Sequence, residues 1–173
     1  MARAARYLVG VVLTSLLACT LAVPIPALAQ SWVNIVWNGT ASVASYSGYP
    51  VSALWDANTS SSWLTAASIA ANTPVTLELE FSGSASPGRL VVSSVANQNA
   101  RMPATLEVEY WDGDSWEAFA SYTGLTWTAA TETRIFALSG APAAQKYRVR
   151  LLKPTANYFQ IAELYFQSAD PPD

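Results

Sequence analysis

The stretch VTLELEF, residues 75–81, alternates strictly between apolar and polar side chains. Its valine, leucine and phenylalanine side chains fall on one face of an extended chain, and its threonine and glutamate side chains fall on the other. A period of two is typical of a β-strand that has one face against a core and one toward solvent. The stretch therefore predicts a half-buried strand rather than a helix.

The rest of the chain extends this pattern. Residues 105–111 alternate in the same way, and the Asp112-Gly113 dipeptide that follows is typical of a tight hairpin turn. Further strands are predicted over residues 32–37, 89–95, 134–138, 146–152 and 159–166. A single helical turn is predicted at residues 50–55, and no segment has a long helical period. Together these segments predict an all-β fold, a β-sandwich jelly roll of about eight antiparallel strands.

Residues 1–29 have the features of an export signal. Arg3 and Arg6 give a positive start, residues 7–23 are almost wholly apolar, and Ala-Leu-Ala at residues 27–29 matches a cleavage pattern of small residues. We therefore expect cleavage after Ala29 and a secreted or cell-surface protein.

Cys19 leaves a second route open. The stretch LLAC, residues 16–19, resembles a bacterial lipoprotein signal, in which Cys19 would carry a lipid anchor. Leu17 speaks against this, because a smaller residue is more usual there. Since Cys19 is the single cysteine of the 173-residue chain, the folded part has no disulfide to stabilise it and must rely on its core or on a metal.

The remaining chain is expected to form one domain over residues 30–167, followed by a loose tail over residues 168–173. Removal of Arg3 and Arg6 leaves seven basic residues against twelve acidic ones, a net charge of −5. An acidic balance argues against nucleic acid or an anionic membrane surface as a partner.

Four motifs follow one another along the chain. They are DANTSSSW at residues 56–63, LEVEYWDGDSW at residues 106–116, KYRVRL at residues 146–151 and IAEL at residues 161–164. In this order they resemble the discoidin family, also called coagulation factor 5/8 type C domains, which includes bacterial carbohydrate-binding modules of the family 32 type. The resemblance covers residues 41–166 and implies a galactose-binding-domain-like β-sandwich.

The DANTSSSW stretch has two interpretations. It can be a polar turn held together by its own hydroxyl groups. In sugar-binding members of the family, however, this loop often holds a structural calcium ion and the glutamate of the last strand closes the site. The resemblance then implies the following ligands: Asp56, Asn58, Ser61 and Glu163. Carboxylate, hydroxyl and carbonyl oxygens suit calcium. Ala57 departs from the family's usual glycine, and a positive φ there would strain the loop by about 1 kcal/mol.

The resemblance also implies a sugar site on the loops at one end of the sandwich. Such a site combines an aromatic platform for the C–H face of a sugar with polar groups for its hydroxyls. The candidates are Tyr46, Asn97, Asn99, Arg101, Asn157, Tyr158 and Phe159. We expect Tyr158 or Phe159 to stack on the ligand and Asn97, Asn99 and Arg101 to donate hydrogen bonds. Two other interpretations remain open, in which Phe159 belongs to the core and Arg101 pairs with a surface glutamate.

Three tryptophans fall within the motifs or near them. Trp63 and Trp116 occupy positions that are structural in the family, and we expect both in the core. Trp127 is either an exposed anchor or a lid on the core. The chain has no histidine, so the galactose site of similar proteins, which often uses one, cannot be transferred intact.

Catalysis is not expected. The commonest general base is histidine, and it is absent, while Asp112 and Asp114 lie on a solvated hairpin tip. The sequence therefore predicts a secreted, non-catalytic carbohydrate-binding module with a structural calcium ion. The alternative is an exported domain of the same fold that docks another protein or has a structural role in the envelope.

Overall fold

A computed structural model of the chain describes residues 31–153 and 155–169. The predicted signal at residues 1–29, with Cys19 and its proposed lipid anchor, lies outside the described residues. Within the described ranges, no helix has the length and apolar character needed to span a membrane. The strands are β1 (Trp32–Asn34), β2 (Val36–Ala41), β3 (Trp63–Leu64), β4 (Val75–Ala85), β5 (Arg89–Ser93), β6 (Thr105–Trp111), β7 (Trp116–Tyr122), β8 (Thr133–Ala137), β9 (Ala144–Leu152), β10 (Gln160–Ile161) and β11 (Glu163–Ala169). The 3₁₀ turns are η1 (Val51–Trp55) and η2 (Asn99–Arg101).

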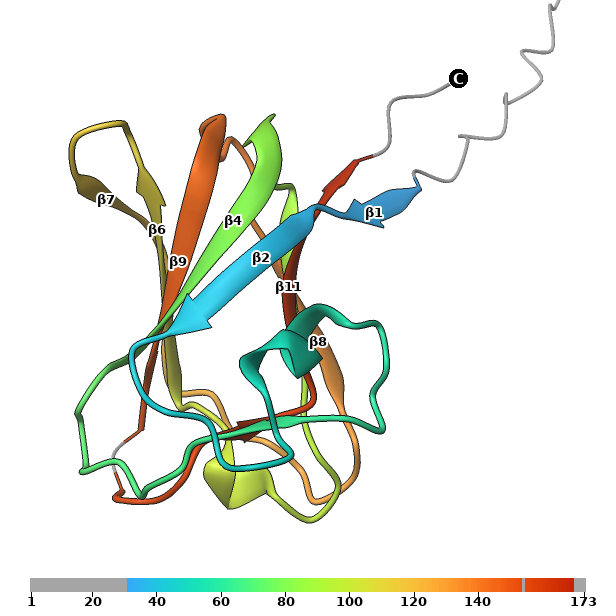
Figure 1. The fold of residues 1–173 in the computed structure, drawn as a ribbon, viewed down its shortest axis with the longest axis vertical. Helices are drawn as coiled ribbons and strands as arrows, with labels where there is room; N and C mark the ends of the chain where they lie inside the picture. Colours follow the sequence, from blue (N-terminus) through green and yellow to red (C-terminus); the bar gives the residue numbers. More distant parts are fainter. Residues whose placement is uncertain (1–30, 154, 170–173) are drawn as a thin grey trace, which may run out of the picture.

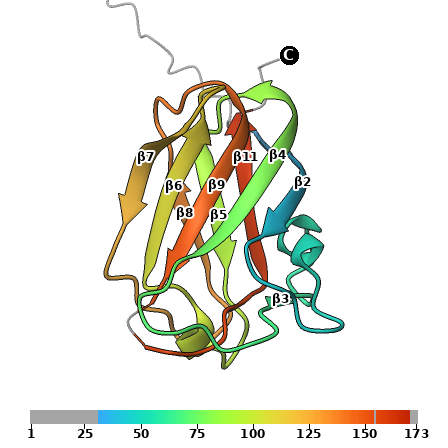
Figure 2. The same cartoon turned by 60° about the vertical axis from the view of Figure 1, so that its left-hand side comes forward.

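Two antiparallel sheets face each other and form a sandwich (Figure 1 and Figure 2). One sheet has the strand order β1-β11-β5-β8, and the other has the order β2-β4-β9-β6-β7. A small pair, β10-β3, lies near one end. The predicted all-β sandwich is therefore confirmed.

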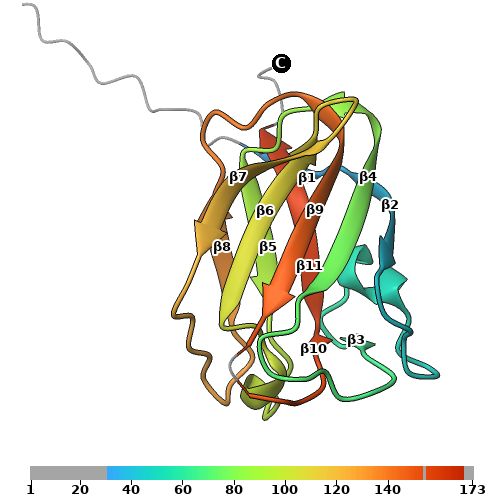
Figure 3. The same ribbon diagram turned by 90° about the vertical axis from the view of Figure 1, so that its left-hand side faces the viewer.

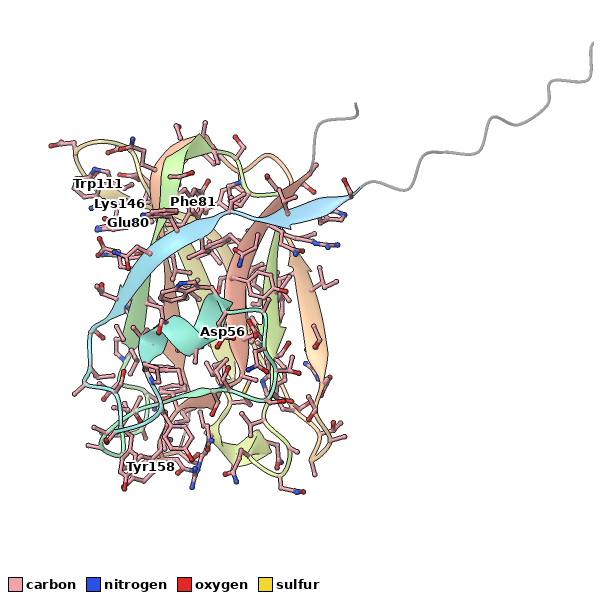
Figure 4. The ribbon with its side chains drawn as sticks, turned by 45° about the vertical axis from the view of Figure 1, so that its right-hand side comes forward. Asp56, Glu80, Phe81, Trp111, Lys146 and Tyr158 are labelled. Carbon is pink, nitrogen blue, oxygen red and sulfur yellow. The ribbon has the colours of Figure 1, made fainter. Side chains whose placement is uncertain are left out.

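The strand predicted from VTLELEF, residues 75–81, forms the first part of β4. Val75, Leu77 and Leu79 are fully buried against the core. The outward-facing Glu78 and Glu80 lie 3.8 and 2.8 Å from Nζ of Lys146 on the neighbouring β9. The alternation thus places the core on one face and cross-strand ion pairs on the other, as Figure 4 shows for Glu80 and Lys146.

The C-terminal tail was predicted too early. Strand β11 continues to Ala169, and Ser168 pairs with Val33 of β1. The edge strand β1 supplies main-chain hydrogen-bond partners to residues that the sequence alone presents as a polar end. Residues 168–169 therefore belong to the sandwich.

Gly39 sets the position of η1 against the sheet. A Cβ atom on this residue would lie 2.6 Å from Cδ2 of Leu79, 2.8 Å from Cη2 of Trp55 and 2.9 Å from the carbonyl oxygen of Glu78. The indole of Trp55 therefore packs where any other residue would place a side chain. Because Asp56 follows Trp55 directly, this close approach also places the DANTSSSW loop.

The three singled-out tryptophans occupy different environments. Trp63 is fully buried, and its indole nitrogen donates to Oγ of Ser45 at 3.1 Å. Trp127 is a lid on the core, since it is 8% exposed and its indole nitrogen donates to the carbonyl oxygen of Pro103 at 2.8 Å.

The core position expected for Trp116 is wrong. Trp116 pairs with Trp111 across the β6–β7 hairpin, and Trp111 points outward because its neighbour Tyr110 points inward. The Trp116 ring is half-buried on the outer face, with the guanidinium carbon of Arg148 4.5 Å from its centroid. It therefore covers an arginine rather than filling the core.

Candidate functional site: an oxygen-rich loop and a polar loop end

The loop between η1 and β3 is held by short-range hydrogen bonds. Oδ1 of Asp56 accepts from the main-chain nitrogen of Asn58 at 2.9 Å, and Oδ1 of Asn58 accepts from that of Ser60 at 3.1 Å. Oγ of Ser61 lies 2.7 Å from both Oδ2 of Asp56 and the main-chain oxygen of Asn58. One hydroxyl proton can serve only one of these oxygens at a time. The loop is thus a self-bonded turn that also crowds three oxygen atoms together.

Ala57 has a φ of 59°. This is the left-handed region, which glycine enters freely and alanine enters at a cost of about 1 kcal/mol. The position therefore has the conformation for which the family's glycine is suited, and the chain forms the loop with alanine instead. The strain expected from the sequence is present.

Glu163 approaches this loop from the start of β11. It is 2% exposed, and neither of its carboxylate oxygens has a hydrogen-bond partner of normal geometry among the described residues. Burial, together with the nearby charge of Asp56, raises the pKa of Glu163 to about 7. The main-chain N–H groups of Asn58 and Ala57 lie close enough to oppose this shift in part. A buried carboxylate beside a second one is unstable unless a proton or a cation compensates it.

The donor set of this loop fits a hard cation. Within residues 31–153 and 155–169, no three acidic, histidine or cysteine side chains gather as a metal site. Two carboxylates, Asp56 and Glu163, do converge, and Ser61 and the main chain of Asn58 add neutral oxygens. Calcium accepts such mixed oxygen sets, whereas zinc prefers nitrogen and sulfur. Both oxygens of Asn58 accept hydrogen bonds in the turn, the side-chain oxygen from Ser60 and the main-chain oxygen from Ser61. The main-chain oxygen is the better candidate because it lies with Oδ2 of Asp56 around the Ser61 hydroxyl.

A second set of predicted residues meets at one end of the sandwich. Nη1 of Arg101, in η2, donates to Oε1 of Gln160 at 2.6 Å, and Nε2 of Gln160 donates to Oγ of Ser62 at 3.3 Å. Arg101 therefore pairs with an amide rather than with the surface glutamate considered above. This chain of contacts joins η2, β10 and the end of the DANTSSSW loop.

Tyr158 lies at the end of the sandwich opposite Trp111 (Figure 4). The β10-β3 pair lies at this end too (Figure 3). The guanidinium carbon of Arg101 is 5.7 Å from the centroid of the half-buried Tyr158 ring. Nδ2 of Asn157 donates to the main-chain oxygen of Ala100 at 3.2 Å, and its Oδ1 accepts from the main-chain nitrogen of Tyr158. Asn157 thus fixes the Tyr158 loop against η2.

Asn97 and Asn99 belong to the same loop as Arg101 and are exposed. Asn97 has a φ of 60°, and its main-chain nitrogen donates to the oxygen of Ala129 at 2.7 Å. This bond draws Asn97 toward the loop before β8. The structure therefore brings Arg101, Asn157 and Tyr158 together. Asn97 and Asn99 precede Arg101 in the same loop.

Phe159 and Tyr46 have other surroundings. Phe159 is fully buried in the core, so it cannot stack on a ligand, and that part of the prediction is wrong. It is buried because its main-chain nitrogen and oxygen bond to Thr65, the buried residue that follows β3. Tyr46 is 52% exposed and makes an edge contact with Tyr49 at 6.1 Å between ring centroids.

Sequence reasoning missed Lys153 at this end. Lys153 follows β9, is 4% exposed, and its Nζ donates to the main-chain oxygen of Tyr158. The alternation of β9 could have predicted this burial. Arg148 and Arg150 point outward, so continuing the alternation past the end of β9 places Lys153 on the inner face.

A hollow of about 360 Å³ lies elsewhere, over β6 and β7. Its charged walls are already paired, since Nη1 of Arg150 lies 2.8 Å from Oε2 of Glu107 and Glu109 bonds to Arg148. Glu107 and Glu109 are thus half-buried in ion pairs.

Comparisons with known proteins bear on the fold. No protein-family model matches the sequence, and no curated protein is significantly similar to it. Among solved structures, the chain is similar to a family 32 carbohydrate-binding module of Clostridium perfringens NanJ in complex with galactose, with 14% identity, a TM-score of 0.62, and coverage of 76% of this chain and 93% of that one. An F5/8 type C domain from Bacteroides fragilis gives 14% identity, a TM-score of 0.62, and coverage of 81% and 93%. A pectin-binding carbohydrate-binding module gives 18% identity, a TM-score of 0.58, and coverage of 82% and 96%.

The chain has the discoidin-like fold. The resemblance read from the four sequence motifs is confirmed at this level. At such low identity the likeness establishes the sandwich and does not transfer any ligand.

Proposed function

We propose that this protein is a secreted, non-catalytic carbohydrate-binding module. The observation that carries the proposal is the half-exposed Tyr158 ring with the Arg101 guanidinium beside it and Asn157 fixing its loop. A sugar binds such a site by placing its C–H face on the ring and its hydroxyls against the polar neighbours. Solved structures with this fold include modules that bind galactose and pectin.

The ligand need not be galactose. The chain has no histidine, so it lacks one donor that sugar sites of similar proteins often use. The polar groups at this end are a guanidinium and amides, which donate to hydroxyl or carboxylate oxygens.

A calcium ion at the DANTSSSW loop is part of the proposal. Asp56, Glu163, Ser61 and the main-chain oxygen of Asn58 would hold it. The support is the buried Glu163 carboxylate, which lacks a hydrogen-bond partner of normal geometry. Bound calcium would neutralise the two carboxylates and tie β11 to the loop after η1, away from direct contact with the sugar.

The module is proposed to be non-catalytic. The pKa of Asp112 is lowered by hydrogen bonds from the main-chain nitrogens of Ser115 and Asp114, so this acid stays ionised and cannot donate a proton at neutral pH. Glu163 has a raised pKa, but at 2% exposure it is out of reach of a substrate. Export by residues 1–29 completes the proposal and rests on the signal pattern alone.

Docking of another exported protein is less well supported. The exposed large apolar residues are Val33, Trp37, Tyr46, Tyr49 and Ile135. Val33 and Ile135 lie on opposite edge strands of one sheet, and Trp37 lies on an edge strand of the other. A docking surface would gather such residues into one broad patch.

The test is a glycan-array screen of residues 30–173, followed by calorimetric titration of the best glycan. Tyr158→Ala should weaken binding at least tenfold, which is the loss expected from removing one stacking contact of about 1.5 kcal/mol. Trp37→Ala is the matched control, because this aromatic is 75% exposed and lies on a distant strand edge. A folded protein that binds no glycan would refute the proposal. Repeating the titration in EDTA tests whether a calcium ion at the DANTSSSW loop strengthens glycan binding.

A further inference from the structure

Lys153 is an unusual residue to bury. It is 4% exposed, and its Nζ lies 3.9 Å from the centroid of the Phe159 ring while donating to the oxygen of Tyr158. An ammonium group removed from water is costly unless an opposite charge lies close to it. Lys153 therefore needs compensation beyond one carbonyl and one ring.

No acidic side chain of the described residues supplies that compensation. Ion pairs engage Arg134, Lys146, Arg148 and Arg150. Among the described residues, Arg89, Arg101 and Lys153 take part in none of the ion pairs, and Arg89 lies away from this end, where it bonds to Gln167. The charges of Lys153 and Arg101 instead act on one another, since Arg101 adds to burial in lowering the pKa of Lys153 to about 8. Two cations thus lie at the loop end without a carboxylate.

The Arg101 guanidinium is placed to meet an anion. One of its nitrogens is held by Gln160, which leaves further N–H donors of the planar group free for a ligand. The guanidinium carbon lies over the Tyr158 ring, 5.7 Å from its centroid. A sugar ring stacked on Tyr158 would bring a carboxylate substituent next to these donors, and a guanidinium–carboxylate pair is a strong, directional contact.

We propose that the Tyr158 end selects glycans whose sugars carry a carboxylate, with Arg101 in contact with that group and Lys153 as a positioning residue beneath it. This inference rests on the proposed glycan-binding function. Lys153 holds the Tyr158 main chain in place and adds positive potential under the site. The carboxylate in turn supplies the negative charge that the loop end lacks.

The test uses pairs of ligands in which one member carries a free carboxylate and the other does not. Residues 30–173 would be titrated with oligogalacturonides, with the same oligomers after full methyl esterification, and with sialyllactose and lactose as a second acid and neutral pair. We expect the free acids to bind about tenfold more tightly than their neutral partners at low salt, and the difference to shrink as ionic strength rises. Comparison of the two acids distinguishes uronates from sialic acid as the source of the carboxylate.

Variants locate the effect. Arg101→Gln should weaken binding of the acid much more than binding of the neutral partner, so that most of the roughly tenfold preference for the acid is lost. Arg89→Gln is the matched control, since it removes an equal charge near the opposite end, where Arg89 bonds to Gln167. Lys153→Met should reduce the ratio of acid to neutral affinity, whereas a loss of fold would abolish binding of both ligands. If Lys153→Met does not fold, Arg101→Gln alone tests the selectivity.

The possible outcomes separate the two proposals. Equal affinity for acidic and neutral partners would overturn the selectivity and leave the glycan-binding function intact. A preference that Arg89→Gln abolishes as fully as Arg101→Gln would overturn the location. Absence of binding to every glycan by the folded protein would overturn the function and the inference with it.

Discussion

Glu163 should make the calcium-free protein less stable as the pH rises. Its pKa is about 7 in the folded protein and about 4.5 in the unfolded chain. Between these values the unfolded chain releases the proton and the folded protein keeps it, so the free energy of unfolding falls as pH increases. The gap corresponds to a loss of about 3 kcal/mol, which is complete above pH 7.

Urea unfolding followed by tryptophan fluorescence, in EDTA from pH 4.5 to 7.5, measures this loss. Glu163→Gln keeps the shape of the side chain and removes the titration, so its stability should lack this component and exceed that of the wild type most at the upper end of the range. Asp114→Asn, at the exposed hairpin tip, controls for the change in net charge. If the proposed ion binds, saturating calcium should stabilise the wild type most above pH 7 and should stabilise Glu163→Gln little. Parallel pH curves for the wild type and Glu163→Gln in EDTA would refute the reasoning.

Three further changes test the packing of the fold. Gly39→Ala should destabilise the protein by about 1–3 kcal/mol in thermal unfolding, because the new methyl group meets backbone and indole atoms. Gly83→Ala is the control and should leave the stability nearly unchanged, since nothing lies within 4 Å of the added Cβ atom. Ala57→Gly should raise the free energy of unfolding by up to about 1 kcal/mol by relieving the left-handed strain; a decrease in chemical denaturation would contradict that strain. Trp127→Phe should cost about 1–3 kcal/mol, because it leaves the buried oxygen of Pro103 without its donor, and an unchanged urea midpoint would show that water replaces the bond.

Local patterns predicted most of the fold. The alternation at residues 75–81 and 105–111 places the core face of two strands, and Asp112-Gly113 places the hairpin between β6 and β7. The same alternation could have shown that Trp111 and its partner Trp116 point outward. Family position was a weaker guide there than the period of the strand.

The candidate site could be predicted only in part. Arg101, Asn157 and Tyr158 were predicted because Arg101 ends a polar run between two strands, and Asn157 and Tyr158 lie in the loop before the last strand. Phe159 was included with them because a strand start and a loop end look alike in sequence. Its main-chain bonds to Thr65, the residue after β3 and distant along the chain, decide that it is core.

Local sequence patterns were enough to predict the main strands, the sandwich and the oxygen-rich loop at residues 56–62, because each depends on a local period or a local run of side chains. Tertiary structure alone decided that Glu163 meets Asp56 and that Lys153 lies beside Arg101 without an acid. These meetings depend on which strands become neighbours and on how burial removes water from a charge. A local sequence pattern predicts neither strand pairing nor the burial of a charge, and both set the charge balance of the proposed sites.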